Sequence, residues 1–209
     1  MAGLKNIDKD NVLFVEGSDE CGFFDGMLEN MGITNVQCID SGGIRQFNDK
    51  FVAYSKTSGF RNISRIAFIR DAEKLEAVNA LNSIKSTVYN STIHFSIEEI
   101  SLSNNIIKNN EVVCGVYIMP DNNSSGMLED LFIKYFQNEP ISDCVYKYME
   151  CLESNGIILQ SKSKSTVLSY LASKDECYRI GLAAKQNYID YNKECFDPIK
   201  DFLKKMYVS

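Results

Sequence analysis

The sequence predicts an α/β fold with a mainly parallel central sheet, flanking helices and a helical C-terminal extension. Two observations lead to this prediction. Short apolar runs alternate with amphipathic patterns of helical period as far as residue 137, and such alternation is typical of a parallel sheet covered by helices on both faces. From Pro140 onward only helical patterns are found.

Each element is predicted from its pattern of apolar residues. The predicted strands are residues 11–15, 36–40, 63–69 and 112–119. The predicted helices of the first part are residues 18–31, 44–56, 72–89 and 126–137, and those of the extension are residues 141–153, 165–172 and 198–206. Residues 90–110 combine Asn-rich turns with short apolar stretches, which indicates a strand within an irregular insertion.

The length of 209 residues suits one domain with a substantial appendage. We therefore predict an α/β domain at residues 1–138 and a helical extension at residues 139–209, packed on the sheet. No repeat, low-complexity segment or long linker interrupts the chain.

The charge balance restricts the classes of function. The net charge of −6 argues against a protein that coats nucleic acid, because such proteins are usually basic. It does not exclude an enzyme that contacts phosphates through bound metal, since a carboxylate site is negative until Mg²⁺ fills it. His94 is the single histidine, which argues against chemistry that needs a His pair, and we expect it to be structural.

We expect a cytoplasmic protein that does not associate with membranes. No apolar run reaches the roughly 18 residues of a membrane span, and the first ten residues contain no apolar signal core. The seven cysteines include no CxxC pair, so we expect free and mostly buried thiols.

Acidic residues follow three of the predicted strands. Glu16 and Glu20 follow the first strand, and they lie one helical turn apart. In open α/β sheets, sites form beyond the carboxyl ends of the strands, and carboxylates there can bind Mg²⁺ or Mn²⁺. The predicted metal ligands after the three strands are Glu16, Glu20, Asp71, Glu73, Asp121 and Glu129.

Each acidic residue also has a plainer interpretation. Acids at helix starts commonly cap backbone N–H groups, which would account for Asp19, Asp71 or Asp121 taken singly. Glu129 and Asp130 taken singly would be a solvated helix face. The repetition at three successive strand ends favours the metal site.

The pattern of these segments resembles the TOPRIM domain of topoisomerases, primases and OLD-type nucleases. In that domain one apolar strand ends in Glu-Gly and a later one ends in Asp-x-Asp. Val15-Glu16-Gly17 matches the first motif. Phe68-Ile69-Arg70-Asp71-Ala72-Glu73 matches the second, with a glutamate, one methylene longer, in place of the second aspartate.

The similarity is closer to the OLD-nuclease branch, whose Glu-Gly-x-x-Glu start looks like residues 16–20. A later Asp, Ser and Glu group looks like Asp121, Ser124 or Ser125, and Glu129. The resemblance implies catalytic roles for Glu16 and Asp71, and for a lysine that stabilises transition-state charge. Lys162 or Lys164 can take that place, although residues 161–165 equally fit a solvated helix start.

Residues 11–205 also resemble a small, uncharacterised TOPRIM-related bacterial family. The resemblance rests on short segments at residues 120–122, 126–131, 170–173, 179–181 and 183–186. It implies the TOPRIM-like Rossmannoid fold more directly than it implies an activity.

Two hypotheses follow. The first is a Mg²⁺-dependent phosphotransfer enzyme, specifically a nuclease whose substrate is nucleic acid. The alternative is a non-catalytic TOPRIM-like module that binds a nucleotide or a protein partner, which the acidic charge and Glu73 favour. A nucleotide-sugar or NAD-type binder is disfavoured because no GxGxxG loop follows the first strand. Arg45, Arg61 and Arg70 are candidate phosphate contacts, with surface positions as the alternative.

Overall fold

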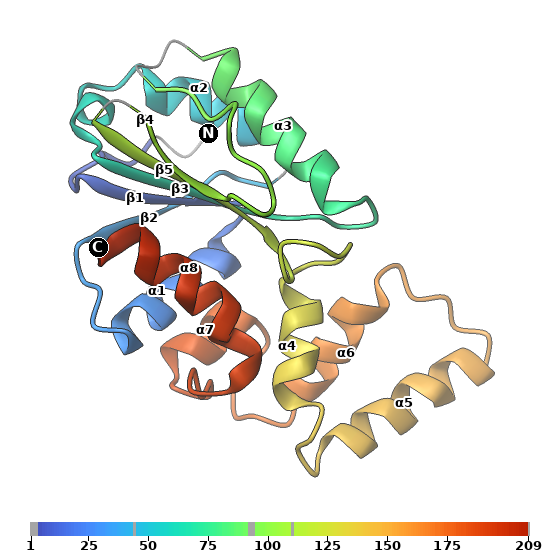
Figure 1. Ribbon diagram of the computed structural model, residues 1–209. Helices are drawn as coiled ribbons and strands as arrows, with labels where there is room; N and C mark the ends of the chain where they lie inside the picture. The colour runs from blue at the N-terminus through green and yellow to red at the C-terminus, as the bar shows by residue number, and fades with distance from the viewer. Residues whose placement is uncertain (1–3, 44, 92–94, 110, 209) are drawn as a thin grey trace.

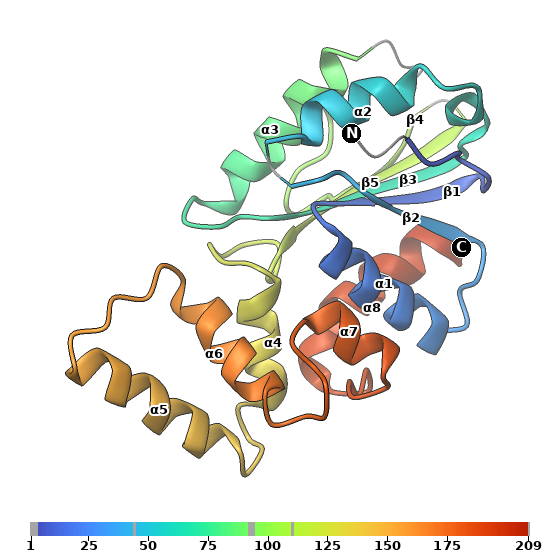
Figure 2. The same cartoon turned by 180° about the vertical axis from the view of Figure 1, so that it is seen from behind.

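The protein is built in three layers around a central sheet (Figures 1 and 2). The computed structural model describes residues 4–43, 45–91, 95–109 and 111–208, so His94 lies outside the described residues. Helices α2 and α3 cover one face of the sheet, and α1, α7 and α8 cover the other. The predicted class, a mainly parallel α/β sheet flanked by helices, is confirmed.

The sheet has the strand order β2-β1-β3-β5-β4. Its strands are β1 (Asn11–Val15), β2 (Val36–Asp40), β3 (Arg65–Asp71), β4 (Ile106–Asn109) and β5 (Val112–Met119). All neighbouring pairs are parallel except β4 with β5. The three strands followed by acidic residues, β1, β3 and β5, are adjacent, so their carboxyl ends meet at one edge of the sheet.

The helices alternate with the strands up to α4 and then follow one another. The α-helices are α1 (Ser18–Asn30), α2 (Phe47–Ser55), α3 (Ala77–Tyr89), α4 (Leu128–Phe136), α5 (Ser142–Ser154), α6 (Lys162–Leu171), α7 (Ile180–Lys185) and α8 (Asp197–Tyr207), and the 3-10 helices are η1 (Ser58–Asn62) and η2 (Glu194–Phe196). None of these, within the described part of the chain, is long and apolar enough to cross a membrane.

Strand alternation divides the core into two clusters. Successive side chains of a strand point to opposite faces. Phe14 of β1 and Phe68 of β3 therefore join the cluster under α2 and α3, where their rings lie 5.8 Å apart. Leu13 and Ile69 join the cluster on the opposite face, which α1, α4 and the C-terminal helices complete. Strands β1, β3 and β5 are thus buried on both faces, which explains their nearly continuous apolar runs.

The C-terminal helices close the second face of the sheet. Helix α8 lies across it, where the Tyr207 hydroxyl donates to the Val12 carbonyl at 2.8 Å and Arg65 Nη1 donates to the Met206 carbonyl at 2.7 Å. Helix α7 lies against α1 (Figure 2). Side chains from the last thirty residues therefore share one apolar cluster with β1 and β3.

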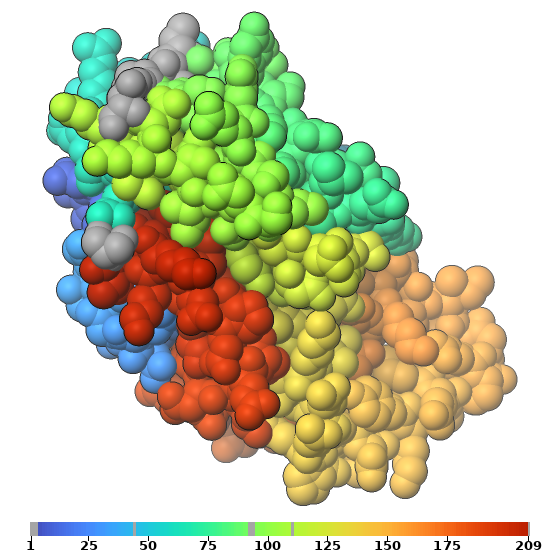
Figure 3. Space-filling model, viewed as in Figure 1, coloured from blue at the N-terminus to red at the C-terminus, as the bar shows by residue number. Residues whose placement is uncertain are grey.

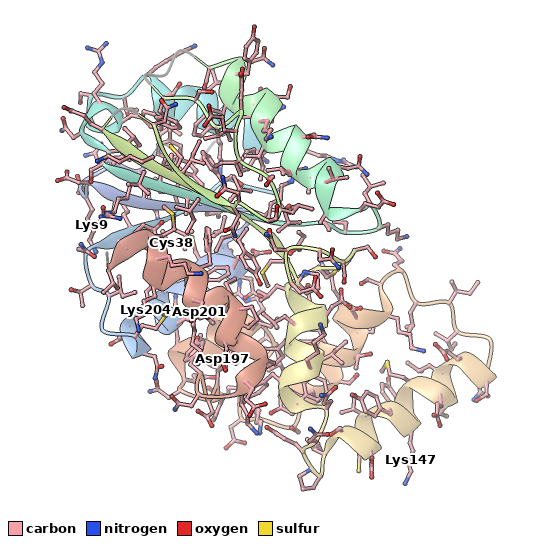
Figure 4. All side chains as sticks on the ribbon, in the orientation of Figure 1. Lys9, Cys38, Lys147, Asp197, Asp201 and Lys204 are labelled. Atoms are coloured by element: carbon pink, nitrogen blue, oxygen red, sulfur yellow. The ribbon has the colours of Figure 1, made fainter. Side chains whose placement is uncertain are left out.

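Helices α4, α5 and α6 extend from the carboxyl edge of the sheet as an arm (Figure 1). The ring of Tyr170 on α6 stacks on Phe136 of α4 with a centroid distance of 4.1 Å, and its hydroxyl donates to Glu139 Oε2 at 2.8 Å. Helix α5 is the outermost element, and Lys147 points from it into solvent (Figure 4). The arm fixes α6 beside α4, next to the acidic edge.

Two of the predicted helices begin later than expected because extended pairing continues past the strands. The helix predicted from residue 72 begins at Ala77, since Ala72 donates to the Met119 carbonyl and Glu73 pairs with Gly126. The helix predicted from residue 126 begins at Leu128 for the same reason. The predicted helix at residues 44–56 spans only Phe47–Ser55.

Other boundaries differ in the extension. Helix α6 begins at Lys162 rather than residue 165, because the Ser161 side chain caps it by accepting from the Lys164 N–H. Helix α7 was not predicted, since its six residues are too few to show a helical period. In the described residues beyond Pro140 no strand is present, as predicted.

The cysteines are free, as predicted, but the expectation that most are buried was wrong. Cys114 and Cys177 are buried, three others are partly exposed, and Cys144 and Cys151 are exposed. The last two lie on α5, the outermost helix of the arm (Figure 1).

The crossing of α1 and α7 depends on two glycines. A Cβ added at Gly22 would lie 2.8 Å from Gly181 Cα and 3.0 Å from its carbonyl oxygen. Both atoms are backbone and cannot move aside as a flexible side chain would. We therefore expect Gly22→Ala to lower the free energy of unfolding by about 1–3 kcal/mol, measured by urea denaturation. Glu29→Ala on the exposed side of α1 is the control and should change it by less than about 0.5 kcal/mol.

Candidate functional site

Glu16 is the first residue after β1, and it is held at the carboxyl edge of the sheet. The Gly43 N–H donates to its carbonyl at 2.6 Å, and Ser41 Oγ lies 3.1 Å from the same oxygen. Glu16 is 8% exposed, and its Oε1 lies 3.3 Å from Arg70 Nε. The backbone N–H of Asp71 also donates to its carboxylate. Backbone and side chain are both fixed before any ligand arrives.

Glu20 lies in the first turn of α1 and folds back over its start. A Cβ added at Gly17 would lie 2.8 Å from Glu20 Oε2, so the absence of a side chain at Gly17 leaves room for this carboxylate. The carboxylate also accepts from its own backbone N–H. This position brings it to the same edge as Glu16, as the four-residue spacing predicted.

Asp71 ends β3 and is joined to the start of α4. The Leu128 N–H donates to Asp71 Oδ1 at 3.0 Å. Asp71 is 8% exposed and pairs in register with Met119, the last residue of β5. The N-terminus of α4 therefore faces this carboxylate, an arrangement that helix dipoles favour.

Glu129, the second residue of α4, brings a lysine into the site. Its Oε1 lies 3.8 Å from Lys164 Nζ of α6, with the lysine side chain 57% exposed and the glutamate side chain 17% exposed. Ser163 Oγ donates to Asp130 Oδ1 at 2.5 Å and thereby ties α6 to α4. In Figure 3 the segment around residues 120–127 reaches the surface between the α3 layer and α6.

We refer to Glu16, Glu20, Asp71 and Glu129 as the carboxylate cluster. Burial is the largest cause that raises the pKa of each one, and the neighbouring carboxylates raise the pKa values of Glu20 and Asp71 further. The pKa of Glu20 rises to about 7. Arg70 lowers the pKa of Glu16, and Lys164 lowers that of Glu129, without cancelling the effect of burial. Two cations thus face four carboxylates.

The cluster fits a hard divalent cation in chemistry and in charge. Its side-chain donors are oxygens, the ligand type that Mg²⁺ and Mn²⁺ prefer, and an added cation would relieve the repulsion that raises these pKa values. In the described part of the chain, no three His, Cys, Asp or Glu side chains are close enough together to hold an ion as they stand. An ion would have to draw the carboxylates together.

The other predicted site residues lie around this cluster or apart from it. Glu73 is exposed, with a positive φ of 55°, and its charge raises the pKa of Glu16. Asp121 accepts from the Ser124 N–H at 2.7 Å and lies 3.6 Å from Lys134 Nζ. Lys162 Nζ lies 2.6 Å from Glu153 Oε1 on α5. Of the two predicted lysines, Lys164 is thus the one that contacts the cluster.

Three residues of the site were missed or misplaced by sequence reasoning. Arg70, predicted at the surface or on phosphate, is 7% exposed. The two-residue period of β3 was a usable signal, because it puts Arg70 on the same side as buried Phe68. Ser41 gave no signal, and the alternative interpretation of Asp19 was a cap of its own helix. Asp19 does not cap its own helix but accepts from the N–H groups of Ile180 and Gly181, at 3.2 and 2.8 Å.

Comparisons with known proteins identify the family. The family model described as "Protein of unknown function (DUF3226)" matches residues 10–208, and the chain belongs to this family. No curated protein matches the sequence.

Two solved structures are similar to this chain. A hypothetical protein from Pyrococcus horikoshii OT3 is 15% identical, with 94% of each chain covered and a TM-score of 0.59. The C-terminal region of the OLD protein from Xanthomonas campestris pv. campestris is 12% identical, with 97% of this chain and 98% of that chain covered and a TM-score of 0.49. The first similarity shows that the fold is shared by a protein of very different sequence.

Glu20 gives the site a pH dependence that can be measured in the absence of metal. Its folded pKa of about 7 lies above the ordinary value of 4.5, so the folded state binds the extra proton and loses stability as pH rises from about 5 to 8. Glu20→Gln should remove this loss and raise the free energy of unfolding at pH 8 by roughly 1–3 kcal/mol. Urea denaturation in EDTA at pH 5 and 8 measures it. An equal pH dependence in both proteins would contradict the assignment.

Proposed function

We propose that this protein is a Mg²⁺-dependent phosphodiesterase, specifically a nuclease with a TOPRIM-like site. The observation that carries the proposal is the carboxylate cluster at the carboxyl edge of the sheet, where four partly dehydrated carboxylates face two cations. Keeping such groups together costs free energy in the absence of a ligand. The Glu-Gly and Asp-x-Glu motifs that supply Glu16 and Asp71 resemble those of OLD-type nucleases.

The residues of the site would have different roles in metal binding and in catalysis. Glu16, Glu20, Asp71 and Glu129 would hold the ion, and Glu73 and Asp121 stay predicted ligands. Bound Mg²⁺ would polarise the phosphoryl group and offset its developing charge. Lys164 is exposed enough to turn from Glu129 toward a phosphate oxygen and add positive charge there.

Divalent-metal binding is the first property to test. Glu16→Gln combined with Asp71→Asn removes two of the four charges of the cluster and should weaken Mn²⁺ binding by more than about 100-fold, beyond the range usual for outer-shell changes. Isothermal titration calorimetry at pH 8 measures the affinity. The matched control is Glu29→Gln with Asp143→Asn, which removes two exposed carboxylates outside the cluster and should bind Mn²⁺ as the native protein does. Equal affinity in all three proteins would refute the metal site.

Phosphodiester cleavage is the second property to test. Linear and structured DNA and RNA are incubated with the native protein in Mn²⁺ and in EDTA. We expect cleavage only in Mn²⁺, reduced by Lys164→Met to no more than about one hundredth, because one transition-state charge contact is lost. Lys162→Met, which removes the lysine paired with Glu153, is the control and should retain activity. Similar losses in both variants would contradict the role of Lys164.

A non-catalytic TOPRIM-like module is the second candidate function. The observation that favours it is Glu73, whose backbone is fixed by two hydrogen bonds with Gly126 of 2.7 and 2.8 Å while its side chain is exposed. Metal binding without cleavage of any substrate, together with Mg²⁺-dependent nucleotide binding, would support this candidate over a nuclease.

A further inference from the structure

Arg70 and Asp71 are adjacent in β3, and their side chains point to opposite faces of the sheet. Asp71 points toward the start of α4, where it accepts from the Leu128 N–H. Arg70 points toward the α2 and α3 layer, following Phe68 and Ile66. An arginine in this layer is unusual, because the cluster around it is otherwise apolar.

Arg70 contacts Ser83, Phe47 and Glu16. Its Nη1 donates to Ser83 Oγ of α3 at 2.8 Å, and its guanidinium carbon lies 5.7 Å from the ring centroid of Phe47. These contacts hold the planar group so that Nε faces Glu16 Oε1 at 3.3 Å, with 7% of the arginine side chain and 10% of the glutamate side chain exposed. The guanidinium is fixed on two sides and its remaining face is directed at one carboxylate.

We infer that Arg70 is a positioning residue for Glu16, which it aims at the ion without touching the ion itself. This inference rests on the proposed function, because the ion is the one assigned there to the carboxylate cluster. Arg70 occupies Oε1 of Glu16, and the Asp71 N–H donates to the same carboxylate. A carboxylate held by two donors has lost most of its rotational freedom, so it is preorganised for an incoming cation.

The direction in which deletion of Arg70 changes Mn²⁺ affinity distinguishes a positioning role from a purely electrostatic one. A fixed positive charge beside a cation site repels the cation, so deleting Arg70 should tighten Mn²⁺ binding if charge alone mattered. If Arg70 positions Glu16, its deletion should weaken Mn²⁺ binding despite the removal of that repulsion. The two interpretations therefore predict opposite changes for one substitution.

The experiment measures Mn²⁺ affinity by electron paramagnetic resonance of the free ion at a fixed pH of 8. Arg70→Met should raise the Kd by roughly 10- to 100-fold, the range usual for outer-shell partners of metal ligands. Arg70→Lys keeps the charge but loses the planar fork, so it should also weaken binding. Arg65→Met, which removes an arginine from the other end of β3, is the matched control and should leave the Kd within about 2-fold of the native value.

A second, less disruptive substitution tests the inference if Arg70→Met does not fold. Ser83→Ala removes one of the contacts that orient Arg70 and leaves every charge in place. It should raise the Kd for Mn²⁺ by about 5-fold, which is the loss of one ordinary hydrogen bond. An unchanged or lower Kd in Arg70→Met, or in both Arg70→Lys and Ser83→Ala, would overturn the inference.

A thermodynamic cycle without metal distinguishes failure of this inference from failure of the proposed function. Unfolding in EDTA is measured for the native protein, Arg70→Met, Glu16→Gln and the double variant. The double variant should lose less stability than the sum of the two single losses, because each single change leaves a buried partner unmatched. If the native protein binds no Mn²⁺, the metal site is refuted, and the cycle still decides whether Arg70 holds Glu16. Strict additivity in the cycle would overturn the inference.

Discussion

The surrounding structure has to compensate for the charge repulsion and the lost hydration of four carboxylates, those of Glu16, Glu20, Asp71 and Glu129. Each carboxylate is drawn out of water, and burial raises the pKa of all four. Such groups stay together only where backbone N–H groups, nearby cations or a bound ion compensate. The parallel strands bring the acidic segments to one edge, and the contacts around that edge restrain them individually.

Segments far apart in the chain supply those restraints. Asp19 of α1 accepts from the start of α7, more than 150 residues later, which holds the first turn of α1 and with it Glu20. Ser163 joins α6 to Asp130 of α4 and so keeps Lys164 beside Glu129. The extension therefore contributes to the site as well as to the core.

The sequence predicted the strands better than the helix starts. A strand buried on both faces appears as a continuous apolar run, as β1 and β5 do, and both have the predicted bounds. The shorter and partly exposed β2 also has its predicted bounds. Helices α3 and α4 begin later than their apolar periodicity suggests, because Glu73 and Gly126 form an isolated bridge between them. That bridge joins residues 53 positions apart, so no local pattern could reveal it. Helix α7 is held by packing against α1 and by the cap from Asp19, and its own six residues carry little information.

The sequence by itself determined the α/β class and the occurrence of acids at the ends of β1, β3 and β5, because apolar period and turn chemistry are local properties. Only the tertiary structure decided which acids meet. Glu16, Glu20, Asp71 and Glu129 influence one another electrostatically, whereas Asp121 pairs with Lys134 and closes its own turn. It also decided that Lys164 and Arg70 are the cations of the cluster. Strand order and helix packing set these distances, and both depend on contacts between residues that are distant in the sequence.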